Sequence, residues 1–178
     1  MSELYSYIID HTGQPCITNR KLVLSECKPS LDSKNLKKKR WIGIRYGAKK
    51  GDWVIATLGK NYDVECFGGE LFSNHGKNPR FFLVYAMKVT IEPDSKNTIR
   101  KPLKSSHFFI PKRPMPIPES YHEMASRGRQ YRHLKYTDDA KLIDAFESWI
   151  EGKMHKYPKS TKFNCPKKTL HQKCKKCN

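Results

Sequence analysis

Aromatic and basic residues alternate in the segment that leads into the first long apolar run, a pattern that could bind the bases and phosphates of a nucleic acid. Residues 34–50 hold eight Lys or Arg and no acidic residue. Trp41, Tyr46 and Trp53 offer ring faces on which a base can stack, and each stacked base contributes roughly 1–3 kcal/mol. Core packing is the stronger alternative for Trp53, because it lies inside the apolar run. The guanidinium fork of Arg45 suits either a phosphate or a base edge.

Two further groups of cations could contact phosphates. Lys28 precedes the segment at 34–50, and Lys49 and Lys50 are its last two residues. Residues 127–133, with the sequence RGRQYRH, gather three arginines around one glycine, together with a tyrosine and a histidine. Such a cluster can form an anion-binding loop, and solvated arginines before a helix are the alternative. The predicted nucleic-acid contacts in this cluster are Arg127, Arg129, Arg132 and His133.

The C-terminal segment combines basic charge with residue types that bind metals. From residue 153 to the end there are nine Lys and no acidic residue. Four side chains could supply the corners of a tetrahedral zinc site: Cys165, His171, Cys174 and Cys177. Their spacing matches no standard zinc knuckle, so a basic arm that binds phosphates without a metal is the alternative. Both alternatives favour a nucleic acid, DNA or RNA, as the partner.

Signs of catalysis are sparse. Cys27 could act as a nucleophile assisted by a histidine such as His11 or His133, provided that a nearby cation or imidazole lowers the pKa of the thiol. The general bases nearest to these motifs are Asp10, Asp52 and Asp63, and Asp52 has a structural role in a turn. The sequence contains no P-loop, no Rossmann glycine fingerprint and no His-Glu-x-x-His motif. An enzyme of nucleotide or base modification that uses Cys27 or His133 is therefore the second hypothesis.

The composition fits one domain with an acidic partner. The chain has 178 residues and a formal net charge of +18, with 37% hydrophobic residues. That length is enough for one core and a small appendage. No stretch has the length and apolar character of a membrane span, and the first residues lack the features of a signal peptide, so we expect a cytoplasmic protein. In a reducing cell, the clustered C-terminal cysteines indicate metal ligands or free thiols.

Several short strands are expected to position these residues. Runs rich in β-branched and aromatic residues predict strands at 4–9, 22–25, 53–58, 81–91 and 106–110. The Gly51-Asp52 pair predicts a tight turn before the third of these strands. Turn signals predict a long loop over residues 61–80, and the proline-rich residues 111–120 predict an extended connector.

One helix is predicted after the connector. Thr137 is its expected cap, acidic residues fill its first turn, and Gly152 is its expected end. A core-facing stripe at helical spacing is formed by Leu142, Ile143, Phe146, Trp149 and Ile150. Residues 30–39 form a weaker helix candidate. Together these elements predict an α+β fold, a small, partly open β-barrel with flanking helices.

Five short motifs occur in a fixed order: CKP at 27–29, Ile44-Arg45, Ala48, GDWV at 51–54 and LVYAMKV at 83–89. This order resembles the second type of nucleotide-modification-associated domain, a family of phages and bacteria. LYSYII near the start and the segment at 108–133 also resemble this family, so the resemblance covers most of residues 4–152. The chain departs from the family by a lysine-rich insertion before Ile44 and by a long insertion before LVYAMKV. The arrangement is also similar to the PUA-like group with its EVE and ASCH members.

The resemblance implies a PUA-like nucleotide-modification-associated domain at residues 1–152 and a basic tail at 153–178. It also implies a pocket near Trp41, Arg45 and Trp53 that receives a base, including a modified base, extruded from nucleic acid. We therefore expect a nucleic-acid-binding protein associated with nucleic-acid modification or phage–host defence, in a bacterial or phage-infected cell. A protein-interaction module whose basic surface binds an acidic partner protein is a further alternative.

Overall fold

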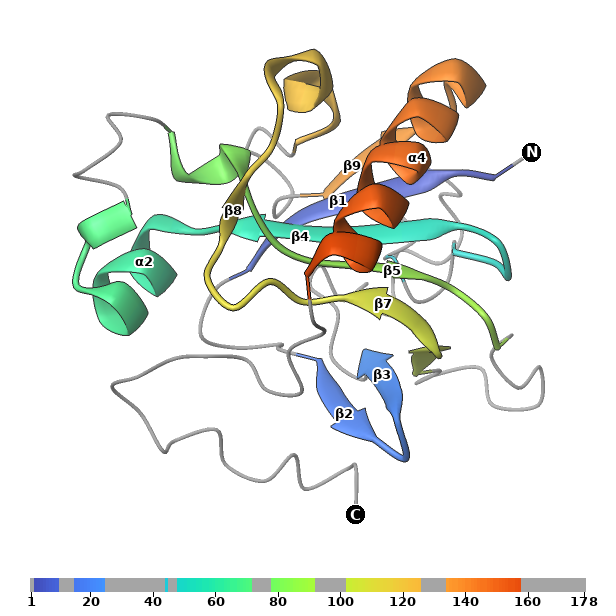
Figure 1. Ribbon diagram of the computed structural model, residues 1–178, viewed down its shortest axis with the longest axis horizontal. Helices are drawn as coiled ribbons and strands as arrows, with labels where there is room; N and C mark the ends of the chain where they lie inside the picture. Colours follow the sequence, from blue (N-terminus) through green and yellow to red (C-terminus); the bar gives the residue numbers. More distant parts are fainter. Residues whose placement is uncertain are drawn as a thin grey trace, which may run out of the picture.

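The fold is α+β, as the sequence predicts, and in the described residues its strands form two sheets beside one long helix (Figure 1). The computed structural model describes residues 2–9, 15–24, 44, 48–71, 78–91, 102–125 and 134–157. Within those residues the main sheet has two separate edges, so the strands form no closed barrel, and the partly open barrel stays a prediction. The helix candidate at 30–39 lies outside the described residues.

The main sheet has six strands in the order β7-β5-β4-β1-β9, with β8 also paired to β5. Its strands are β1 (Leu4–Ile9), β4 (Trp53–Leu58), β5 (Phe82–Lys88), β7 (His107–Phe109), β8 (Met115–Pro116) and β9 (Leu134–Thr137). The central strands β1 and β4 are parallel, and the other pairs are antiparallel. The two central strands read as nearly continuous apolar sequence because both of their faces are covered.

The second sheet is a three-stranded antiparallel sheet in the order β2-β3-β6. Its strands are β2 (Cys16–Thr18), β3 (Lys21–Leu24) and β6 (Leu103–Ser105). Asn19 and Arg20 join β2 to β3, and both have positive φ, +50° and +60°. A two-residue hairpin turn with positive φ at both positions twists in the same sense as its strands. The predicted strand at 22–25 is therefore the inner strand of a hairpin sheet.

In the described part of the chain, four helical elements with defined bounds accompany the sheets: α2 (Lys60–Phe67), η2 (Pro79–Phe81), η3 (Glu119–Met124) and α4 (Ala140–Lys156). The predicted loop at 61–80 is wrong where α2 lies, since Tyr62 and Cys66 occupy one buried face of that helix. Thr137 ends β9 instead of capping α4, and the carboxylate of Asp139 accepts from the backbone amides of Lys141 and Leu142. The helix continues through Gly152 to Lys156, so its predicted end is also wrong.

Apolar side chains cover both faces of the main sheet. Val54 and Ala56 of β4 face one cluster, which also contains residues of the second sheet and of α2. Trp53 and Ile55 face the opposite cluster, which contains the buried side of α4. The buried residues of α4 are Ile143, Phe146 and Ile150, which confirms the core-facing stripe, while Leu142 and Trp149 are only partly buried. The alternation along β4 places α4 and the second sheet on opposite faces.

The predicted turn before β4 is confirmed. Gly51 has a φ of +96°, a conformation that suits glycine. The carboxylate of Asp52 accepts from the backbone amides of Glu3, at 2.9 Å, and of Lys49, at 2.7 Å. Burial raises the pKa of Asp52 above its ordinary value and outweighs these hydrogen bonds, which lower it. The contacts of Asp52 are thus structural, and they tie the start of β1 to the turn.

Cys16 of β2 and Cys66 of α2 are each disulfide-bonded. The positions of the cysteines in the sequence gave no sign of these bonds. Disulfides are rare in cytosolic proteins of most organisms, so the cytoplasmic location stays a prediction. Of the helices in the described ranges, none is both long enough and apolar enough to cross a membrane.

Candidate functional site

Most of the residues that the sequence singles out lie outside the described residues. These are Cys27, Lys28, Trp41, Arg45, Tyr46, Arg127, Arg129, Arg132, His133, Cys165, His171, Cys174 and Cys177. The zinc site and the cysteine nucleophile therefore stay predictions. In the described part of the chain, no group of three or more His, Cys, Asp or Glu side chains is placed to hold a metal ion.

Three of the predicted contact residues are described. Lys49 and Lys50 are exposed on the turn before β4, where an approaching phosphate can reach them. Trp53 is completely buried instead. Its ring contacts those of Phe146 and His107 edge to face, with centroids 6.1 Å and 5.9 Å away. Trp53 therefore has no ring face open to a base and belongs to the core under α4, which was the stronger alternative for it.

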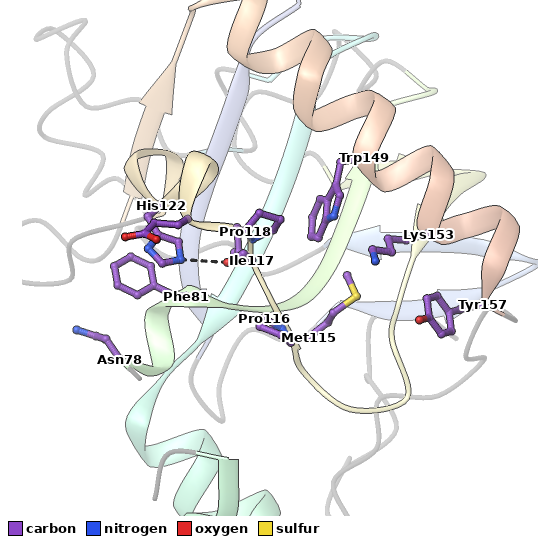
Figure 2. A pocket seen from close by; sticks show the side chains of 11 residues that line it. Asn78, Phe81, Met115, Pro116, Ile117, Pro118, His122, Trp149, Lys153 and Tyr157 are labelled. Carbon is purple, nitrogen blue, oxygen red and sulfur yellow. Dashed lines mark hydrogen bonds between the residues drawn. The ribbon is translucent and has the colours of Figure 1, made fainter. Parts of the chain in front are cut away.

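A different region of the molecule contains a pocket. Its volume is about 760 Å³, and η2, residues 115–118, η3 and the C-terminal half of α4 surround it. Strand pairing holds residues 115–118 in place, because β8 pairs with the start of β5 and the amide of Ile117 donates to the carbonyl of Phe81 at 2.8 Å. Figure 2 shows these residues crossing the middle of the pocket, with ring-bearing side chains to either side.

One side of the pocket is formed by Phe81 of η2 and His122 of η3. Their rings stack face to face, with centroids 3.7 Å apart and an angle of 5° between the planes. The guanidinium of Arg80 lies 4.5 Å from the centroid of Phe81. His122 Nε2 lies 3.0 Å from the carbonyl oxygen of Ile117, which fixes the orientation of the imidazole (Figure 2). This side thus combines a flat stacked pair with a cation.

The other side is formed by Trp149, Lys153 and Tyr157, each one helical turn after the last. The ammonium of Lys153 lies 5.9 Å from the ring of Trp149 and 5.8 Å from that of Tyr157. Lys156 also lies 5.8 Å from the ring of Tyr157. Trp149 is anchored against Phe146, and Tyr157 is 43% exposed. This side therefore has both a fixed ring and an accessible ring, with two cations between or beside them.

A polar network holds α4 in the position that forms this wall. Trp53, Lys88 and His107 are neighbours in register across β4, β5 and β7. Glu147 accepts from Trp53 Nε1 at 3.2 Å and from the ammonium of Lys88. Glu151, one helical turn later, pairs with His107. Each strand of this row thus contributes a side chain that fixes the helix on the sheet.

Glu147 is ionised in this network. Burial alone raises its pKa, but the hydrogen bonds from Lys88 and Trp53 and the positive charges nearby lower it more. The pKa of Glu147 therefore lies below its ordinary value of 4.5. The charge of Lys88 is neutralised at this site, whereas within the described residues no carboxylate forms an ion pair with Lys153.

The pocket has the properties needed to hold a flat, anionic ligand. Ring faces and edges can contact a planar heterocycle, and Lys153, Lys156 and Arg80 can attract its phosphates. Glu119 is the single carboxylate that lines the pocket in the described part of the chain. Sequence reasoning missed this site, because the predicted helix end at Gly152 separated Lys153 and Tyr157 from Trp149. The regular spacing of these three residues was the available signal.

Comparisons with models of protein families, with curated proteins and with solved structures find no match to this chain.

Proposed function

We propose that this protein binds single-stranded or locally opened nucleic acid and takes up an unstacked base in the pocket between η2, η3 and α4. The observation that carries the proposal is the combination, in one pocket, of aromatic rings with the ammonium of Lys153, which no described carboxylate neutralises; Arg80 and Lys156 lie against lining rings. Modified bases are included among the ligands, and the association with nucleic-acid modification or phage–host defence belongs to the same proposal.

Stacking supplies the part of the affinity that depends on the base. A base leaves its own stack at a cost of a few kcal/mol, and an aromatic ring in the protein returns roughly 1–3 kcal/mol. Tyr157 and His122 are the rings with the easiest access, since Trp149 is packed against Phe146 and Phe81 is covered by its stacked partner. The pocket favours a base that is already unpaired, because less energy is then needed to open it.

Cations supply the part of the affinity that depends on salt. Lys153 lines the pocket, Lys156 lies beside the lining residue Tyr157, and Lys49 and Lys50 extend the basic surface elsewhere. The formal net charge of +18 adds a long-range attraction to any polyanion. Phosphate contacts of this kind release counterions, so affinity falls steeply as the salt concentration rises.

We also propose that this α+β fold is PUA-like. The turn at Gly51-Asp52, the following strand β4 and the antiparallel strand β5 support it, since these are the motifs on which the resemblance rests. The sequence predicts a pocket near Trp41, Arg45 and Trp53, and none of these residues is among the described residues that line the pocket between η2, η3 and α4. Trp41 and Arg45 lie outside the described residues, so their proposed base contact stays a prediction.

The test is a titration of labelled oligonucleotides of about ten nucleotides, a usual site size, by fluorescence anisotropy over a series of salt concentrations. Single-stranded DNA, single-stranded RNA and duplex DNA are compared, with unmodified, methylated and hydroxymethylated bases. We expect Tyr157→Ala and Lys153→Gln to weaken single-strand binding roughly tenfold each. Lys141→Gln, an exposed lysine at the opposite end of α4, is the matched control and should leave the affinity unchanged.

Two results would contradict this proposal. One is that no oligonucleotide binds at low salt, in which case an acidic partner protein becomes the better hypothesis. The other is that Lys153→Gln and Lys141→Gln weaken binding equally, because the net charge and not the pocket would then determine affinity. Trp41→Ala in the same titration tests the contact that the sequence predicts.

A further inference from the structure

The pocket is larger than one base requires. Even at the ~30 Å³ that a water molecule occupies in the liquid, the roughly ten non-hydrogen atoms of a purine base fill about 300 Å³. The pocket measures about 760 Å³, more than twice that volume. A single base would therefore leave much of the pocket and many of its ring contacts unused.

The rings of the pocket fall into two groups. Phe81 and His122 stack on each other, and Trp149 and Tyr157 both lie against the ammonium of Lys153. In Figure 2 the two groups lie on opposite sides of Met115, Pro116, Ile117 and Pro118. Side chains that are well separated in one view are separated in space, so one planar ligand cannot stack on both groups at once.

Of the two cations beside these rings, Lys153 lines the pocket and Arg80 does not. Arg80 lies over Phe81 on one side, and Lys153 lies between Trp149 and Tyr157 on the other. A ring next to a cation is the unit that binds one nucleotide, through its base and its phosphate. The pocket therefore contains two groups of rings, one with a cation in the pocket lining and the other with a cation beside it, and apolar residues lie between the two groups.

We infer that the pocket binds two consecutive nucleotides with their bases splayed apart, one base at the Phe81/His122 pair and the other at Trp149 and Tyr157. The inference rests on the proposed function and names its ligand more closely, as a dinucleotide unit of a single strand. Met115 and Pro116 lie between the two positions and keep the bases unstacked from each other. Proteins that unstack neighbouring bases commonly place apolar side chains of this kind between them.

The test compares ligands of equal charge. A single-stranded dinucleotide with terminal phosphates is titrated against the same molecule with one base removed, and against the one with the other base removed. We expect the intact dinucleotide to bind about tenfold more tightly than either abasic form, since each stacked base adds its own contribution. Isothermal titration calorimetry at low, fixed salt gives both the affinity and the stoichiometry.

Two variants assign the bases to the two positions. His122→Ala and Tyr157→Ala should each reduce the affinity for the intact dinucleotide to about that of an abasic form. Each variant should then bind the intact dinucleotide and one of the two abasic forms with equal affinity. Thermal unfolding of both variants checks that the fold is intact, and the abasic comparison in the unaltered protein does not depend on them.

The outcomes separate this inference from the proposed function. If the intact and the abasic dinucleotides bind equally, and Tyr157→Ala weakens both equally, the pocket holds one base and the inference is overturned while the function stands. If none of these ligands binds but longer single strands do, the inference is overturned as well, because affinity then comes from outside the pocket. If no nucleic acid binds at all, both are overturned.

Discussion

A tryptophan and a lysine lie at each of two faces of α4, but their surroundings differ. On the face toward the sheet, Glu147 neutralises Lys88 and accepts from the buried Trp53. On the face toward the pocket, Lys153 lies against Trp149 and Tyr157. Both faces thus combine a tryptophan with a lysine, but the first includes a carboxylate as the lysine's partner. Where a carboxylate neutralises the lysine, the basic and aromatic cluster stabilises the fold. Where no described carboxylate does so, the cluster can bind an anion.

Helical spacing explains how one helix serves both purposes. Glu147 and Glu151 are one turn apart, and both face the row of Trp53, Lys88 and His107. Trp149 and Lys153 are also one turn apart, but they lie two residues further along the chain and therefore point to another side of the helix. Substitutions on the two faces should consequently affect different properties, stability on one and binding on the other.

Removing the buried ring should have the largest effect. Trp53→Ala leaves a large cavity under α4 and should lower the free energy of unfolding by about 3–5 kcal/mol. Urea unfolding monitored by circular dichroism measures the change. Trp53→Phe, which keeps a ring but loses the donor to Glu147, should cost less than Trp53→Ala. A loss below 1 kcal/mol for Trp53→Ala, on the scale of a surface change, would contradict the assignment of Trp53 to the core.

Breaking the ion pair on the sheet face should have the next largest effect. Lys88→Gln leaves the carboxylate of Glu147, only 26% exposed, without its main charged partner. We expect a loss of about 1–2 kcal/mol in the free energy of unfolding, because a hydrogen bond to a charged group is lost. Oligonucleotide affinity measured under conditions where the variant is folded should stay within twofold, roughly the uncertainty of such a titration. A large affinity loss with unchanged stability would reverse the roles of the two faces.

The same network should make stability depend on pH. The pKa of Glu147 is lower in the folded protein than its ordinary value of 4.5, so the folded state favours the ionised form. Its contribution to stability is therefore present above the unfolded pKa and is lost as the pH falls through the folded pKa. Urea unfolding between about pH 3 and pH 6 should show the difference between the protein and Glu147→Gln shrinking toward acidic pH. A difference that stays constant over this range would rule out ionised Glu147 as its source.

The matched substitution on the pocket face should hardly affect stability. Lys153→Gln is expected to change the free energy of unfolding by no more than about 0.5 kcal/mol, since its charge has no ion-pair partner among the described residues. It should instead reduce the salt dependence of single-strand binding by about 0.7 in the slope of log affinity against log salt, the value for one phosphate contact. An unchanged slope would mean that Lys153 contacts no phosphate.

The second ion pair should have the smallest effect. The side chains of His107 and Glu151 are 34% and 35% exposed, and the pair is charged only when His107 is protonated. Solvent therefore weakens the interaction, and Glu151→Gln should cost less than about 0.5 kcal/mol in urea unfolding. A cost equal to that of Lys88→Gln would show that the two ion pairs act as one unit, which a double variant can test.

The strands with correctly predicted bounds are those that a short stretch of sequence specifies by itself. The strands β1 and β4 have the predicted bounds, because each is an apolar run between clear turn residues. The prediction missed α2 because, of its side chains that the structure describes, only Tyr62 and Cys66 are buried, and because Gly68-Gly69 follows at once, which indicates a turn. The end of α4 was misplaced because glycine usually ends a helix, whereas Gly152 is an exposed position within this one.

The pocket could not be predicted from any single segment. It forms where residues 78–81, 115–122 and 149–157 meet; strand pairing joins the first two stretches, and the contacts of α4 with the sheet bring in the third. Sequence analysis assigned Trp149 to the core stripe, and the structure shows that the same ring both packs against Phe146 and lines the pocket. The helical spacing of apolar residues predicts the packing role of Trp149 but not its position in the pocket lining.

The position of β1 has a consequence for how the chain reaches this fold. Leu4 pairs with Trp53 of β4 on one side and with Thr137 of β9 on the other, so β1, which is synthesised before both partners, lies inside the main sheet (Figure 1). At the usual rate of translation, β9 leaves the ribosome several seconds after β1. During that interval one edge of β1 has no partner strand, and pairing over so long a sequence separation is slow. The nascent chain is therefore expected to depend on chaperones until α4 and β9 have been made.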